Sequence, residues 1–302
     1  MPAAVPAAGE VTVRVPATAA NLGPGYDCFG LALQRYDVVT AAVRPAGVRV
    51  DVEGVGAGEV PMDATHLVIR AMSRAWQAVG LELPPVWLRC HNAIPHGGGQ
   101  GSSAAAIVAG LLLGQGLLPA DAPPLSRDDV LQLGTEMEGH PDNVAPALLG
   151  GFTLAWCGED GAAGAVRREV HPDVRAVMFT AAESSLTHHA RALLPAAVPH
   201  ADAAANVAAA ALLVHALTTD PGYLLEATRD RLHQPYRAAS MPATTRLLTE
   251  LRGAGVAAVV SGAGPSVLAL TTTDLPADIA AGAGFQSAEL PVCTTGATVT
   301  LG

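Results

Sequence analysis

The chain has 302 residues; half of them are hydrophobic, only 15% are charged, and all 17 basic residues are arginines. The absence of lysine excludes a Walker A phosphate loop, a protein-kinase active site, a pyridoxal-phosphate Schiff base and a lysine-dependent aldolase. A phosphate site here would need arginine, backbone N–H groups or a metal ion. The formal net charge of -10 disfavours nucleic acid and anionic membrane surfaces as partners.

The length predicts two domains, at about 150 residues per domain. The most apolar segment, residues 203–217, contains Asn206 and His215 and is shorter than a membrane span, so it predicts a buried helix. Residues 1–10 lack a basic start followed by an apolar run. We therefore expect a disordered N-terminus, no secretory signal and a cytoplasmic protein. The four cysteines are scattered and predict free thiols.

In chain order, the first half alternates strands and helices irregularly. Its patterns predict strands at 11–15, 36–43, 48–52, 86–91 and 152–156, with 36–43 and 48–52 as a pair, and helices at 66–79, 104–113 and 128–138. The second half predicts strands at 176–181, 256–261 and 267–271, and helices at 187–194, 203–217 and 243–253. This order predicts an α+β fold, with an N-terminal domain at 11–155 and a C-terminal domain at 156–302.

The strongest local signal is a glycine loop at residues 97–103, which ends in Ser102 and Ser103 and runs into an apolar helix. Glycines let a ligand approach the backbone closely. The first N–H groups of a helix have no internal partner and attract anions without any lysine. The loop therefore indicates a phosphate site. The alternative is a flexible connection with an ordinary serine N-cap.

A polar segment at residues 138–143 lies between two apolar stretches. Glu138 could hold Mg²⁺, which prefers oxygen ligands, while Asp142 and Asn143 could orient a substrate hydroxyl or amine. The alternative is an Asx-type turn that caps the next helix. Glu138 and His140 do not predict a zinc site, because no third ligand has suitable spacing.

Two further turns and two arginines are candidates for ligand contact. The turns, at 21–27 and 262–266, are rich in glycine and polar residues, and ordinary turn chemistry explains them equally well. Arg191 and Arg237 could each clamp a carboxylate with two hydrogen bonds. Each could equally form a surface salt bridge.

Taken in order, four segments resemble the signatures of the homoserine kinases, which belong to the GHMP (galactokinase, homoserine kinase, mevalonate kinase, phosphomevalonate kinase) superfamily. They are PATAANLGPGYD at 16–27, IPHGGGQGSSAA at 94–105, EGHPDNVAP at 138–146 and SGAGPS at 261–266. The resemblance implies a ribosomal-protein-S5-like N-terminal domain and a ferredoxin-like C-terminal domain, whose last strands pack back on the N-terminal domain. It also implies transfer of the γ-phosphate of ATP to the hydroxyl of L-homoserine, in threonine biosynthesis, and a possible homodimer.

The resemblance also implies roles for individual residues. ATP would contact Pro95, His96, Gly97, Gly98, Gly99, Gln100, Gly101, Ser102, Ser103, Ala104 and Ala105, with residues 66–68 against the adenine. Mg²⁺ would lie on Ser103 and Glu138. The homoserine pocket would include Asn21, Asp27, His140 and Asp142, with Arg191 and Arg237 on the carboxylate, Thr187 in support and Gly264 closing the site. Asn143 would align the reacting hydroxyl, and Asp142 would bind the substrate rather than act as a base.

Two departures from the family pattern leave questions open. Gln100 stands where the family's loop usually has leucine, and it either adds a ligand contact or lowers stability. Glu136 is a second candidate for the metal-binding glutamate. The alternatives to a homoserine kinase are another GHMP kinase, acting on a mevalonate-type or sugar substrate, and a non-catalytic homologue.

Overall fold

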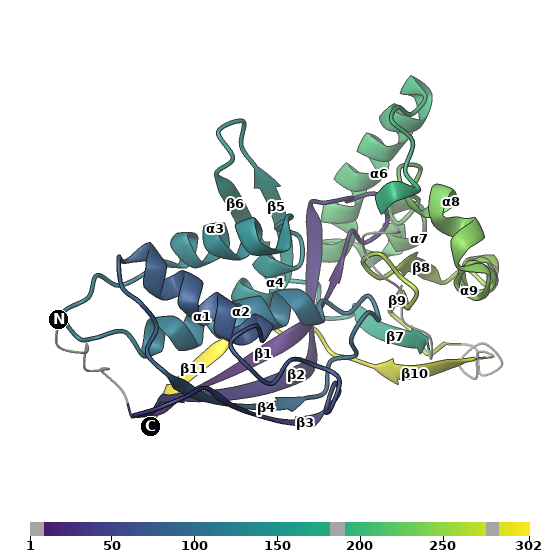
Figure 1. Cartoon of the computed structure of the whole chain (residues 1–302). Helices are drawn as coiled ribbons and strands as arrows, with labels where there is room; N and C mark the ends of the chain where they lie inside the picture. The colour runs from purple at the N-terminus through teal and green to yellow at the C-terminus, as the bar shows by residue number, and fades with distance from the viewer. Residues whose placement is uncertain (1–8, 182–190, 276–283) are drawn as a thin grey trace.

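The computed structural model describes residues 9–181, 191–275 and 284–302, which form two β-sheets with their own helices (Figure 1). The larger sheet has seven strands: β1 (Val11–Ala20), β2 (Phe29–Val43), β3 (Arg49–Gly54), β4 (Val86–Asn92), β5 (Phe152–Cys157), β6 (Ala163–Arg168) and β11 (Thr298–Leu301). The smaller has four: β7 (Arg175–Ala181), β8 (Ala257–Val260), β9 (Val267–Thr271) and β10 (Phe285–Glu289). The predicted α+β class is confirmed.

Strand pairing in the larger sheet differs from the sequence prediction at one place. The order is β11-β1-β2-β4-β3, and β5 pairs with the first residues of β2 and with β6. Residues 36–43 are the second half of β2, and β3 pairs in parallel with β4 instead of with them. The expected pairing of 36–43 with 48–52 is therefore wrong. The helix α1 (Leu67–Ala78) connects β3 to β4, as a parallel pair requires.

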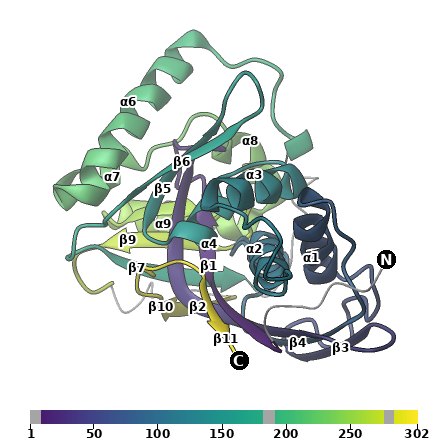
Figure 2. The same ribbon diagram turned by 90° about the vertical axis from the view of Figure 1, so that its left-hand side faces the viewer.

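Four helices cover one face of the larger sheet: α1, α2 (Ser102–Gly116), α3 (Arg127–Glu138) and α4 (Val144–Leu149) (Figures 1 and 2). α2 is apolar on nearly every side and lies at the centre of the main core. A Cβ atom on Gly110 would clash with the carbonyl of Val68, so glycine allows α1 and α2 to pack closely. The indole N–H of Trp76 donates to the Gly114 carbonyl at 3.0 Å. This packing fixes the position of α2 against α1.

Helices of the second half surround the smaller sheet. They are α6 (His200–Thr218), α7 (Leu224–Ala227), α8 (Gln234–Arg237), α9 (Pro242–Gly253) and two 3₁₀ turns, Pro221–Tyr223 and Ala238–Ser240. The prediction that the 203–217 segment is a buried helix is wrong about its burial, because α6 buries only Asn206, Leu213, Ala216 and Leu217. Within the described part of the chain, α6 is the one helix long and apolar enough to cross a bilayer by length and composition; a single such helix also occurs in proteins that enter no membrane.

The two halves of the chain meet along β1 and β2. Residues at the end of β1 and the start of β2, such as Ala19 and Leu31, pack in the core of the smaller sheet, while Val11 and Val39 pack under α1 and α2. β11, the last strand, pairs with β1. The larger sheet also includes β6, which lies beyond the predicted boundary at 155/156. The turn between β1 and β2 is thereby placed against the C-terminal half.

Candidate active site

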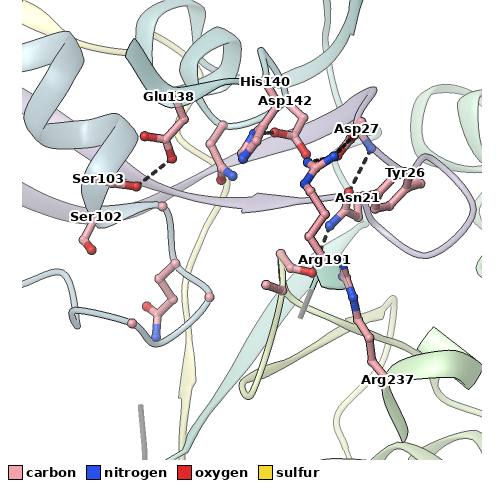
Figure 3. A pocket seen from close by; sticks show the side chains of 17 residues that line it. Asn21, Tyr26, Asp27, Ser102, Ser103, Glu138, His140, Asp142, Arg191 and Arg237 are labelled. Atoms are coloured by element: carbon pink, nitrogen blue, oxygen red, sulfur yellow. Dashed lines mark hydrogen bonds and ion pairs between the residues drawn. The ribbon is translucent and has the colours of Figure 1, made fainter. Parts of the chain in front are cut away.

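One cavity at this junction collects side chains from all four resemblance segments (Figure 3). It is lined by Asn21, Tyr26, Asp27, Gly97, Gly99, Gln100, Gly101, Ser102, Ser103, Glu138, His140, Asp142, Asn143, Arg191, Arg237, Gly262 and Ala263. Segments separated by more than a hundred residues therefore meet at one place. We call the end at the glycine loop the phosphate end and the end at Asp27 the amino-acid end.

A second, more apolar cavity adjoins the phosphate end, and Ser102 and Ser103 line both cavities. Its walls include His96 and Ala105 from the predicted ATP segment, and His66, Leu67 and Val68. Of the other predicted ATP contacts, Pro95, Gly98 and Ala104 line neither cavity in the described part of the chain. Burial raises the pKa of the Cys90 thiol in this second cavity to about 12, so that thiol is not a nucleophile at neutral pH.

The backbone of the glycine loop alternates in conformation. Gly97, Gly99 and Gly101 have positive φ angles of 62°, 72° and 68°, whereas Gly98 and Gln100 do not have positive φ. Such alternation turns successive N–H groups toward one side and makes an anion-binding concavity. Gly101 is also the N-cap of α2, and no side chain bonds to the first N–H groups of that helix. The alternative of a serine N-cap is therefore wrong, and these N–H groups stay available to a ligand.

Two glycines in this loop are required by their neighbours as well as by φ. A Cβ atom on Gly101 would clash with the Thr18 hydroxyl, and one on Gly99 would clash with the carbonyl of Ser261. The Ser261 hydroxyl donates to the Gly99 carbonyl at 2.6 Å. The loop is thus held against the 261–266 turn. Gly264, predicted to close the site, lies within this turn but is not one of the described residues that line the cavity.

Ser103 and Glu138 lie side by side at the phosphate end, and the Ser103 hydroxyl donates to the Glu138 carboxylate at 2.6 Å (Figure 3). Burial raises the pKa of Glu138, although the hydrogen bond from Ser103 lowers it. A carboxylate and a hydroxyl suit Mg²⁺, which usually keeps several waters and takes phosphate oxygens as further ligands. The other candidate, Glu136, is exposed and pairs with Arg74 at 2.8 Å.

The residues after Glu138 turn into the middle of the cavity. His140 Nδ1 lies 2.5 Å from an oxygen of the buried Asp142. Burial acts to lower the pKa of His140, but the hydrogen bond and charge of Asp142, with Glu138 and Asp27, raise it overall. Asn143 makes no capping bond to α4; instead its side-chain oxygen accepts a hydrogen bond from the Thr18 hydroxyl at 2.7 Å. The alternative of an Asx-type helix cap is therefore wrong for Asn143.

Charged side chains dominate the amino-acid end. Both guanidinium N–H groups of Arg191 donate to the two carboxylate oxygens of Asp27 at 2.9 Å (Figure 3). Arg237 is 3% exposed, and the guanidinium carbons of Arg191 and Arg237 each lie 5.6 Å from the ring centroid of Tyr26. The fold therefore brings these two predicted candidates together beside one aromatic ring at the cavity wall. Thr187 lies outside the described residues.

The turn that carries Asp27 is held in an unusual backbone conformation. Asn21, Leu22 and Asp27 all have positive φ angles, of 68°, 47° and 54°, which non-glycine residues adopt mainly where surrounding structure enforces them. The Asn21 side chain donates to the Gly262 carbonyl and accepts from the Asp27 N–H, both at 2.9 Å. Asn21 thus builds the turn and joins it to the second half of the chain.

Sequence reasoning missed three residues of this site: Thr18, Tyr26 and His233. His233 is fully buried, lies 5.3 Å from the Tyr26 ring, and has Nε2 at 2.9 Å from the Gly23 carbonyl. Burial lowers its pKa. Neutral His233 can therefore donate from Nε2 and accept at Nδ1 from Arg237, which lies 3.2 Å away. Thr18 and Tyr26 belong to the 16–27 segment, so that segment was the available signal; His233 had none.

Comparison with known proteins places this fold and site in a class. Residues 66–151 match the family model "GHMP kinases N terminal domain", and residues 204–286 match "GHMP kinases C terminal". Together the two matches span more than half of the chain, so the protein is a GHMP kinase.

The curated relatives are more specific. Over 294 residues the chain is 49% identical to the homoserine kinase of Streptomyces coelicolor, with 97% of this chain and 95% of that protein covered. It is 48% identical to the homoserine kinase of Rhodococcus opacus, with 95% and 96% covered. The crystal structure of homoserine kinase from Cytophaga hutchinsonii superposes with a TM-score of 0.84 at 27% identity, covering 97% of this chain and 98% of that one. The chain belongs to the homoserine kinase family, which confirms the resemblance.

Proposed function

We propose that this cavity transfers the γ-phosphate of ATP to the side-chain hydroxyl of L-homoserine and gives O-phospho-L-homoserine. One observation carries the proposal: an anion-binding loop and charges that match an amino-acid zwitterion line the same cavity, which Asn143 also lines. This arrangement suits phosphoryl transfer, which depends chiefly on positioning and electrostatic stabilisation.

The nucleotide would occupy both cavities. Its base would lie in the apolar second cavity, near His66 and Val68, and its phosphates would follow the glycine loop to the start of α2. Ser103 and Glu138 would hold Mg²⁺ together with phosphate oxygens. When bound, the ion neutralises phosphate charge. Only the ionised form of Glu138 can bind the ion, and burial raises the pKa of this carboxyl, so bound Mg²⁺ would have to hold Glu138 in its ionised form.

The amino acid would enter by exchanging partners with an existing ion pair. Asp27 and Arg191 bond to each other in the described structure. The ammonium of homoserine would replace Arg191 on Asp27, and its carboxylate would bind Arg191 and Arg237. Each charge of the pair keeps an opposite charge after the exchange, so no charged group is left without a partner. Mevalonate and galactose lack the ammonium, so neither would replace Arg191 on Asp27.

Asn143 would align the reacting hydroxyl. The Thr18 hydroxyl occupies the side-chain oxygen of Asn143, so its NH₂ group is directed to another acceptor, which in the cavity would be the homoserine oxygen. Asp142 is held by His140. It would bind the substrate and would not act as a base that removes a proton. The hydroxyl would therefore attack directly, and its proton would pass to the transferred phosphoryl group.

A coupled ADP-release assay tests this function. The purified protein, with ATP and Mg²⁺, is given L-homoserine, L-serine, L-threonine, mevalonate or galactose in turn. We expect L-homoserine to give the highest kcat/KM and EDTA to abolish turnover. Turnover with another acceptor and none with L-homoserine would overturn the proposal.

A further inference from the structure

The glycine loop contains one fully buried polar side chain, Gln100, whose amide has both ends engaged. Its side-chain oxygen accepts from an N–H of Arg35 at 2.5 Å, and its NH₂ donates to the Thr180 hydroxyl at 2.9 Å. The carbonyl of Gln100 accepts from the backbone N–H of Thr18 at 3.1 Å. Both ends of the side-chain amide are therefore hydrogen-bonded to other residues of the protein. The Gln100 side chain anchors the loop and does not serve as a ligand contact.

The partners of Gln100 come from both sheets. Arg35 lies in β2 of the larger sheet, and Thr180 lies in β7 of the smaller sheet. Leucine at this position would leave the Arg35 and Thr180 groups without their partner. A buried polar group without a partner costs free energy, so these three residues act as one unit.

The electrostatic surroundings of Arg35 are a second feature of this residue. It is half-buried, and within the described residues no carboxylate lies within ion-pair distance of it, whereas Arg175 and Arg191 each contact at least one. A guanidinium stays protonated in proteins. The positive charge beside the glycine loop is therefore not neutralised by a neighbouring acid in the described part of the chain.

We propose that Gln100 is a positioning residue that holds Arg35 behind the phosphate end, and that Arg35 supplies fixed positive charge to bound nucleotide phosphates without contacting the substrate hydroxyl. This inference rests on the proposed function, because it takes the loop to hold the nucleotide phosphates. It gives this lysine-free chain a cationic side chain at a loop otherwise built from backbone. Charge–charge interaction acts through several ångströms in a partly buried site.

Nucleotide binding separates this role from a structural one. Calorimetric titration measures the Kd of ADP and of adenosine, in EDTA, for the wild type and for Arg35→Met, Arg35→Lys and Arg44→Met. Arg44→Met is the matched control, because it removes the same net charge. Arg44 directly follows β2, and its guanidinium carbon lies 5.0 Å from the Trp87 ring centroid. We expect Arg35→Met to raise the Kd of ADP about tenfold (1.4 kcal/mol) and to change that of adenosine less than twofold. Arg35→Lys should recover most of the loss, and Arg44→Met should change neither value.

Gln100→Leu provides the second, independent test, because it preserves the charge but removes the anchor. We expect it to raise the KM for ATP several-fold and to leave the KM for L-homoserine unchanged. Equal effects of Arg35→Met on ADP and adenosine, or no effect on either, would overturn the charge role. An unchanged KM for ATP in Gln100→Leu would overturn the positioning role. If wild-type protein bound no ADP, the proposed function itself would fail, which is a separate result.

Discussion

The two ends of the cavity differ in the groups that line them. The phosphate end is made of glycine backbone, a helix N-terminus, two serines and one carboxylate, and no cationic side chain among the described residues lines it. The amino-acid end is made of charged side chains, with Asp27 and Arg191 paired and Arg237 beside them. Backbone dipoles suit a ligand of one charge sign, whereas a zwitterion needs both signs a few ångströms apart.

This difference predicts which substitutions should impair each end. The phosphate end should be sensitive to changes in backbone geometry and in the Glu138 carboxylate, whereas the amino-acid end should respond to loss of a single charge. Variants that reversed this pattern would show that the two ends do not bind different parts of the reaction.

The largest effect is expected for Glu138→Gln. Loss of the carboxylate should lower kcat by about 1,000-fold, because removing charge stabilisation from a transition state costs several kcal/mol. The free energy of unfolding of this variant, in contrast, should rise. The pKa of Glu138 is raised by burial, so its ionised form is penalised in the folded state at any pH above that raised pKa, and the neutral amide removes the penalty at pH 7.

Steady-state kinetics and urea unfolding at pH 7 check both effects of Glu138→Gln. Glu136→Gln is the matched control, since Glu136 is exposed and bonds to Arg74 and Gln132. It should retain at least half of the wild-type kcat. Equal losses in the two variants would remove Glu138 from the metal site.

Gly101→Ala should follow in size. A Cβ atom there would clash with Thr18, and the residue needs a φ of 68°. We expect kcat/KM for ATP to fall by about 100-fold and the free energy of unfolding to fall by about 2–4 kcal/mol. Gly98→Ala, whose φ is not positive, should cost less than about 1 kcal/mol. Similar kinetics for the two variants would contradict a cradle formed by the backbone.

Asn143→Ala tests the boundary between the two ends. We expect kcat to fall by about 100-fold, as for loss of one preorganised hydrogen bond to a reacting group, with less than a threefold rise in the KM for L-homoserine. Thr18→Val should show a weaker form of the same effect, and Thr18→Ser, which keeps the hydroxyl, should restore it. A pure KM effect in Asn143→Ala would place this residue in substrate binding instead.

Arg191→Met should affect the amino-acid end alone. Removing a charge-assisted pair of hydrogen bonds costs about 2 kcal/mol, or roughly a 30-fold rise in the KM for L-homoserine. The KM for ATP should change less than twofold. Arg49→Met is the control, because Arg49 forms an exposed ion pair with Asp51. A matching rise in the KM for ATP would show that Arg191 serves both substrates.

The smallest effect concerns pH and His140. Its pKa is raised above the ordinary 6.5 by Asp142, against the effect of burial. The stabilisation is therefore complete below the ordinary pKa and is lost as pH rises through the raised one. In EDTA and without nucleotide, the difference in unfolding free energy between the wild type and His140→Gln should shrink as the pH rises above the ordinary pKa of about 6.5. A difference that stays constant with pH would exclude the charged pair.

Local sequence predicted the segments of the site but not the connections between them. The glycine loop and the 138–143 segment were predictable because the turns that they form depend on residues that are consecutive in the sequence. The role of Gln100 was not, because it depends on Arg35 and Thr180, which lie 65 and 80 residues away. For the same reason the parallel pairing of β3 and the exposure of α6 were missed, since both depend on which element packs alongside.

The sequence by itself determined which groups are available to this protein: a glycine loop in a chain without lysine, a polar segment with two carboxylates, and arginines. Tertiary structure decided which group meets which. The Thr18–Asn143 bond spans 125 residues, and the Asp27–Arg191 pair spans 164. Hydrogen bonds and ion pairs act over a few ångströms, so the partners of a side chain are fixed only when the folded chain brings distant segments into contact.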